Sequence, residues 1–179
     1  MWRVVLALFL SLALLLTIPG TALGQGQGKG KPQSLAATGT IDSISPGNVL
    51  PAGESGRWRV VERELDGELY EGDISGDFHM AYKANVELET QAGNLHGTLK
   101  IGEYVLKVNG KIEPLEFEGW LEPGIPLYKL TISGHWTFIE GATGQGTFDA
   151  WVIFIPTPEG HIYAITSSSF TLDGKWQPH

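Results

Sequence analysis

Hydrophobic and polar residues alternate along most of the chain beyond its first third, which is the period of a β-strand with one buried face. The stretch 78–90 shows this best, because Phe78 and Met80 fall on one face while His79 falls on the other. Apart from the first 24 residues, no stretch has the period of a helix. The pattern therefore predicts an all-β protein.

Further strands follow from the same alternation, bounded by turn-forming Gly, Pro and Asn residues. They cover residues 36–45, 57–73, 95–101, 104–112, 127–139, 147–155 and 161–173. At Pro114 the alternation changes phase, which predicts a bulge or a sheet edge. About eight antiparallel strands are typical of a barrel or a β-sandwich. We favour the barrel, because closure removes exposed strand edges, and keep the sandwich as the alternative.

The N-terminus has the features of a secretory signal peptide at residues 1–24. Its apolar run, residues 4–18, is shorter than the roughly 20 residues of a membrane span. Residues 25–34 are rich in Gly, Gln and Lys and predict a flexible tether, so that residues 35–179 form one domain. We expect a soluble protein, secreted or periplasmic, that has no membrane partner after cleavage; an uncleaved signal anchor is the alternative.

Composition excludes several classes of site and partner. The chain has no cysteine, which excludes disulfides, a thiol nucleophile and a lipid-modified cysteine. With no Asn-x-Ser/Thr site either, this favours a bacterial or archaeal exported protein. Residues 35–179 carry nine Lys or Arg and twenty Asp or Glu, a net charge of −11, which disfavours nucleic acid as a partner. No feature predicts an oligomeric state.

No metal, cofactor or catalytic site is predicted. The five histidines lack metal-ligand spacing, and the acidic stretch 66–77 fits a hairpin turn better than a calcium loop. Glu87 and Glu89 share an outer face, where carboxylates are solvated rather than tuned for acid–base work. The run GATGQG at 141–146 precedes a strand and not a helix, so it predicts a turn and not a phosphate cradle.

One hairpin carries a resemblance to a known family. The stretch FIEGATGQGTFDAWVIFIP, residues 138–156, resembles a hairpin of the allene oxide cyclase and dirigent-type β-barrels. The matching residues are Phe138, Glu140, Gly141, Ala142, Gly144 and Gln145. The resemblance implies an eight-stranded antiparallel barrel whose interior holds an apolar small molecule. It carries over no catalytic residue, because the matching residues build a turn and nearly all predicted inward positions are apolar.

The inward aromatic residues are the candidate ligand-binding set. They are Phe78, Met80, Tyr82, Tyr104, Trp136, Phe138 and Phe148. An eight-stranded barrel either fills with side chains or holds one small ligand, so the same residues equally suit a packed core. The leading hypothesis is a non-enzymatic exported barrel that binds an apolar small molecule or serves an envelope role.

Two other functions remain open. A barrel-type isomerase or cyclase would need an inward polar residue, which the tyrosines could supply. A carbohydrate- or surface-binding module would use outward aromatics, and Trp120 and Trp151 are its candidates. Trp151 lies on the face of strand 147–155 opposite the predicted core, so either a long loop or the N-terminal segment covers it, or it belongs to an exposed patch.

Overall fold

The computed structural model describes residues 31–53, 57–87, 89–157 and 162–178, which belong to one unit, Lys31–His179. The predicted signal peptide and residues 25–30 of the predicted tether lie outside the described residues. Ten strands run through the described part of the chain. They are β1 (Gln33–Ile44), β2 (Asn48–Pro51), β3 (Arg57–Gly72), β4 (Gly76–Glu87), β5 (Gly93–Ile101), β6 (Tyr104–Ile112), β7 (Glu116–Glu122), β8 (Ile125–Glu140), β9 (Ala142–Pro156) and β10 (Ile162–Pro178). These residues contain no helix long and apolar enough to cross a membrane.

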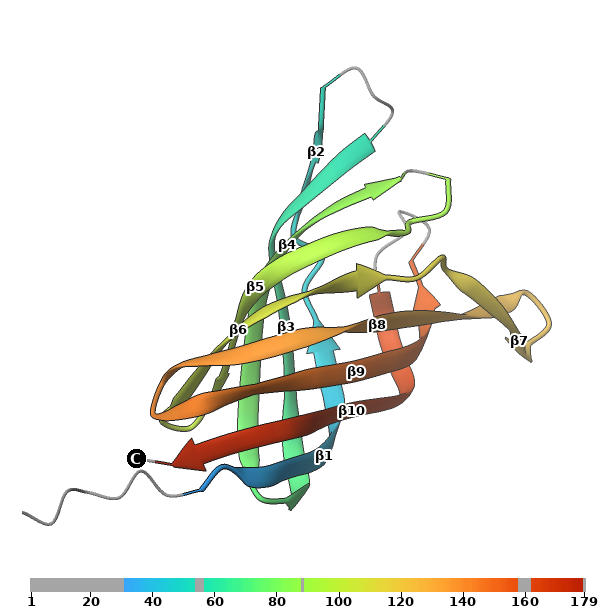
Figure 1. Ribbon diagram of the computed structural model, residues 1–179. Helices are drawn as coiled ribbons and strands as arrows, with labels where there is room; N and C mark the ends of the chain where they lie inside the picture. Colours follow the sequence, from blue (N-terminus) through green and yellow to red (C-terminus); the bar gives the residue numbers. More distant parts are fainter. Residues whose placement is uncertain (1–30, 54–56, 88, 158–161, 179) are drawn as a thin grey trace, which may run out of the picture. The chain divides into compact units, whose positions relative to one another are not determined.

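Eight of the strands close into an antiparallel barrel (Figure 1). The strand order is β1-β10-β9-β8-β6-β5-β4-β3, and pairing between β1 and β3 closes the ring. The two remaining strands are short additions, β2 against β3 and β7 against β8. The predicted all-β barrel of eight strands is therefore confirmed, and the sandwich is not adopted.

Alternation sets the inside and the outside of the barrel as the sequence predicts. On β9, Phe148, Ala150 and Val152 are buried, while Asp149 between them is exposed. The same holds along β4, where the buried positions begin with Phe78. All buried residues of the described chain are apolar or aromatic, so the interior is a hydrophobic core of the kind that drives folding.

Large rings in the core lie against glycines on neighbouring strands. A methyl group added at Gly146 or Gly174 would meet the Trp136 ring at 2.5 or 2.6 Å, so these glycines make the room that the indole fills. The indole N–H donates a hydrogen bond to the Thr147 carbonyl at 2.8 Å, which satisfies its polar atom inside the core. Phe148 lies in the same way against Gly134.

The glycine run at 141–146 differs from the expected loop. Gly141 alone forms the connection between β8 and β9, with φ at 82°, and the other residues of the run already belong to β9. Gly144 and Gly146 are glycine because β10 lies too close for a side chain, with the Lys175 carbonyl oxygen 2.3 Å from a Cβ at Gly144. The expected turn is real but shorter, and strand contact explains the remaining glycines.

Aromatic rings fill one part of the interior. Phe78 and Phe170 stack with their centroids 4.6 Å apart, and Trp136 meets Phe138 edge to face at 5.2 Å. Trp176, near the end of β10, stacks on Phe138 at 6.0 Å. This part of the barrel is a packed core.

Candidate functional site: a cavity at one end of the barrel

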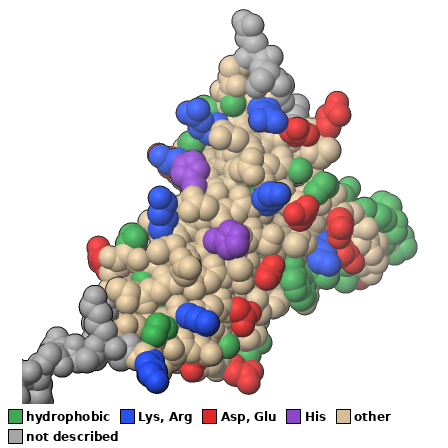
Figure 2. All heavy atoms as spheres, viewed as in Figure 1, with side chains coloured by type: hydrophobic (Ala, Val, Ile, Leu, Met, Phe, Trp, Pro, Cys, Tyr) green, Lys and Arg blue, Asp and Glu red, His purple; other side chains and the backbone are tan. Residues whose placement is uncertain are grey.

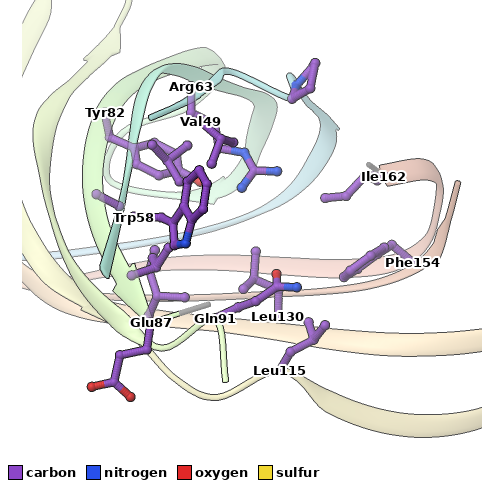
Figure 3. Close-up of a pocket in the computed structure, with 15 residues that line it drawn as sticks. Val49, Trp58, Arg63, Tyr82, Glu87, Gln91, Leu115, Leu130, Phe154 and Ile162 are labelled. Atoms are coloured by element: carbon purple, nitrogen blue, oxygen red, sulfur yellow. The ribbon is translucent and has the colours of Figure 1, made fainter. Parts of the chain in front are cut away.

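The other part of the interior is hollow. A cavity of about 240 Å³ lies where β3 and β10 begin and where β4, β6 and β9 end (Figure 3). Its lining is mostly apolar. The residues are Pro46, Val49, Trp58, Val60, Arg63, Tyr82, Ala84, Val86, Glu87, Gln91, Ile112, Leu115, Leu130, Phe154 and Ile162.

Small side chains explain why this end stays open. Ala84 and Val86 continue the inward face of β4 beyond Tyr82, and Val60 faces them from β3. Because an alanine has one side-chain methyl group and each valine has two, these side chains are too short to fill the space between the walls, and a cavity remains.

A β-bulge turns one charged residue toward the cavity. The pairing of β3 with β4 shifts between Val60 and Arg63, and Glu62 within the bulge has φ at 55°. The extra residue lets both Val60 and Arg63 face inward, although their odd spacing would place them on opposite faces of a regular strand. Arg63 therefore lies beside Tyr82 at the cavity wall, as Figure 3 shows.

Arg63 uses one of its donors within the protein. Its Nε donates a hydrogen bond to the Ser45 carbonyl at 2.9 Å. No carboxylate of the described residues lies within ion-pair distance of its guanidinium. A guanidinium carries five N–H donors, so most of its donor capacity remains for water or a ligand.

Tyr82 places a neutral hydroxyl at the same wall. The residue is only 3% exposed, and its hydroxyl makes no hydrogen bond of standard geometry among the described residues, although the Arg63 guanidinium lies next to it. Burial raises the pKa of the Tyr82 phenol, and the adjacent Arg63 guanidinium opposes that rise through its positive charge and by directing an N–H toward the phenol oxygen. Because burial dominates, the phenol stays protonated near neutral pH and can donate a hydrogen bond.

Two further polar residues lie at the cavity mouth. Glu87 forms an ion pair with Arg57 at 3.8 Å, and in Figure 3 its carboxylate points away from the cavity. Gln91 lies in the connection between β4 and β5 with φ at 57°. Trp58, half-buried, supplies a flat wall near the Arg63 guanidinium. Arg63 is thus the cation that faces the cavity.

The structure separates the predicted ligand-binding residues into two groups. Tyr82 lines the cavity. The others lie in the interior away from its lining, and they are Phe78, Met80, Tyr104, Trp136, Phe138 and Phe148. Sequence reasoning missed Trp58 and Arg63. The sequence does contain a sign of the bulge that turns Arg63 inward. The apolar, buried residues of β3 change from even to odd positions between Val60 and Leu65.

The two outward tryptophans have different surroundings. Trp120 is 61% exposed and meets Phe117 edge to face at 5.5 Å on the β7–β8 hairpin, where Figure 2 shows hydrophobic side chains gathered. Trp151 is half-buried, and the Lys129 ammonium lies 5.9 Å from its ring centroid. Among the described residues, a lysine side chain on β8 therefore covers part of Trp151. The suggested cover by the N-terminal segment falls largely on residues outside the described ones and stays a prediction.

The acidic residues near the β3–β4 connection have structural partners. Asp66 pairs with His79 at 2.7 Å, and a carboxylate oxygen of Asp73 accepts a hydrogen bond from the Ala36 N–H at 2.8 Å. Within the described ranges, no three His, Asp or Glu side chains gather closely enough to hold a metal ion.

Comparison with protein-family models, with curated proteins and with solved structures gives no match.

Proposed function

We propose that this protein binds an apolar small molecule in the cavity at the end of its barrel. The main support is the cavity of about 240 Å³, which has mostly apolar walls in an otherwise close-packed core. A dry cavity of about 150 Å³ lined by aliphatic and aromatic residues admits benzene. The cavity here has room for a somewhat larger ligand, although it is smaller than a typical site for a drug-sized molecule, about 300 Å³ or more.

The residues of the cavity support binding better than catalysis. Among the described residues, the lining contains no Ser, Thr, Cys or His that a neighbouring base could activate as a nucleophile. Glu87 is largely exposed and paired with Arg57, and its carboxylate points away from the cavity, so it is not placed to transfer a proton to a ligand there. In this proposal the protein is exported through the signal at residues 1–24 and acts as a binding protein outside the cytoplasm. The resemblance to allene oxide cyclase and dirigent-type barrels agrees with such a ligand.

The test is binding of a neutral apolar dye to the wild type and to a variant with a filled cavity. 1-Aminonaphthalene, an uncharged fluorophore of about the size that the cavity admits, should bind with increased fluorescence, and Ala84→Leu should weaken its binding about tenfold or more, because the larger side chain occupies the cavity. Ala81→Leu is the matched control. It lies on the same strand but outside the lining, so dye binding should stay within about twofold of the wild type.

Two results would contradict the proposal. One is no dye uptake by the folded wild type, together with native mass spectra that show no bound small molecule. The other is equal loss of binding in Ala84→Leu and Ala81→Leu, which would place the dye at another surface.

A further inference from the structure

We propose that the cavity selects a ligand with an acidic head group, a monocarboxylic acid with a short apolar tail, and that Arg63 binds its carboxylate. This inference rests on the proposed function, since it names the ligand class of the same cavity. It also assigns Arg63 a binding role.

The Arg63 guanidinium has few partners in the described part of the chain. A guanidinium that faces an apolar cavity is costly unless an anion or several hydrogen-bond acceptors surround it. Within the described residues its Nε donates to the Ser45 carbonyl, the Tyr82 phenol lies beside it, and no anion is within ion-pair distance. A carboxylate in the cavity would accept two parallel hydrogen bonds from such a group, which is the geometry that arginine favours.

The groups closest to Arg63 in the lining, Tyr82 and Trp58, carry hydrogen-bond donors. The Tyr82 hydroxyl is protonated and lies beside Arg63, which has no acceptor for its proton, so a carboxylate oxygen can accept a hydrogen bond from it. The Trp58 indole carries only a donor. The carboxylate that lines the mouth, Glu87, is engaged by Arg57 and points outward. A cationic ligand would therefore meet only repulsion from Arg63.

The cavity volume limits the apolar tail. Benzene, with six heavy atoms, occupies a cavity of about 150 Å³, so a cavity of 240 Å³ holds roughly ten heavy atoms. Octanoic acid has this size. Its tail would lie among Ala84, Leu130 and Phe154, with the head group at Arg63.

A purely structural role for Arg63 is the competing explanation. Its Nε holds the Ser45 carbonyl and so ties the connection after β1 to β3. That role uses one donor and predicts no preference among ligands. The two roles therefore differ in a binding measurement and not only in stability.

The experiment compares octanoic acid, octan-1-ol and octylamine as competitors of the neutral dye at pH 7. In a merely apolar cavity the alcohol would compete best, because it carries no charge that must lose its water. With Arg63 as the receptor, octanoate should displace the dye at a concentration about tenfold to a hundredfold lower than octanol, and octylamine should be weakest. This comparison needs no variant and therefore does not depend on how a variant folds.

Variants then assign the preference to Arg63. Arg63→Gln should remove the advantage of octanoate over octanol while the dye and octanol still bind, and Arg63→Lys should keep part of it. Arg59→Gln is the matched control, since it removes one positive charge from an exposed position on the same strand. It should leave the advantage unchanged.

The outcomes separate the two proposals. If the dye binds but octanoate and octanol compete equally, or if Arg63→Gln keeps the preference, the acidic ligand is wrong and the apolar site stands. If neither the dye nor any of the three competitors binds, both proposals fail.

Discussion

At the scale of single residues, the backbone conformation of Glu62 places the Arg63 side chain at the cavity. Its φ of 55° is uncommon for any residue other than glycine, and it lies inside the bulge that shifts β3 against β4. The Glu62 carboxylate accepts a hydrogen bond from the Asn48 side chain of β2 at 2.5 Å, which anchors this conformation. Strained positions of this kind cluster at functional sites, which agrees with a bulge that brings Arg63 to the cavity.

The buried Tyr82 hydroxyl leads to a prediction about alkaline stability. Its pKa is raised by burial above the ordinary value of 10.0, so the folded state holds the phenolic proton after the unfolded state has lost it. Folding therefore loses stability as the pH rises above about 10, by about 1.4 kcal/mol per pH unit until the folded protein also ionises. Tyr82→Phe should lack this loss, in urea unfolding of ligand-free protein at pH 7, 9, 10 and 11.

A control separates this effect from the titration of other groups. Tyr70 is 58% exposed on the same barrel, so Tyr70→Phe removes a tyrosine hydroxyl without removing a buried one, and it should keep the wild-type pH profile. The difference between the wild type and Tyr82→Phe would then report Tyr82 itself. Parallel curves for these two proteins from pH 7 to pH 11 would show that burial does not hold the proton.

At the scale of strands, the β9–β10 pair leads to a prediction for Gly144. Its φ of 153° and the Lys175 carbonyl at 2.3 Å from a Cβ leave no room for a side chain. Gly144→Val should lower the free energy of unfolding by about 2 kcal/mol or more, because the strand must move away from β10. Urea unfolding at pH 7 measures this change.

The neighbouring position gives the matched control. Gln145 is exposed on the outer face of β9, where a β-branched residue suits a strand. Gln145→Val should change the stability by less than about 0.5 kcal/mol. Equal effects at both positions would show that valine is harmful to this hairpin in general, and that close strand contact is not the reason for Gly144.

Alternation predicted the barrel strands because each has one face in the core and one in water. It missed β2 and β7 for the same reason, since neither contributes a buried residue and their burial therefore shows no alternation. The phase change expected at Pro114 is real. Residues 113–115 connect β6 to β7, and the pairing of β7 with β8 is irregular at Phe117 and at Trp120.

At the scale of the whole barrel, the position of the cavity could not follow from alternation. Alternation shows which residues point inward, but the level that each reaches along the barrel depends on the register between strands. Tyr82 is level with Arg63 on one side and Gly97 on the other, whereas Phe78 is level with Gly67 and Ile101. The predicted ligand-binding set therefore combined Tyr82, which lines the cavity, with six residues of the packed part of the core.

The whole chain has a negative net charge, whereas Arg63 places a positive charge at the cavity. The full chain carries a net charge of −8, so an anionic ligand approaches against a repulsive field and meets the attraction of Arg63 only at short range. Salt screens the long-range repulsion at the exposed surface more than it screens a contact within the cavity.

This difference predicts an unusual dependence on ionic strength. The association rate of octanoate should rise by about twofold or more between 10 and 300 mM NaCl, whereas an acidic ligand drawn by a positive surface would bind more slowly as salt increases. Stopped-flow displacement of the neutral dye measures this rate, and octanol, which has no charge, is the control with a constant rate. An octanoate rate that falls with salt would mean that positive residues guide the ligand from outside, and the acidic surface would then have no part in its selection.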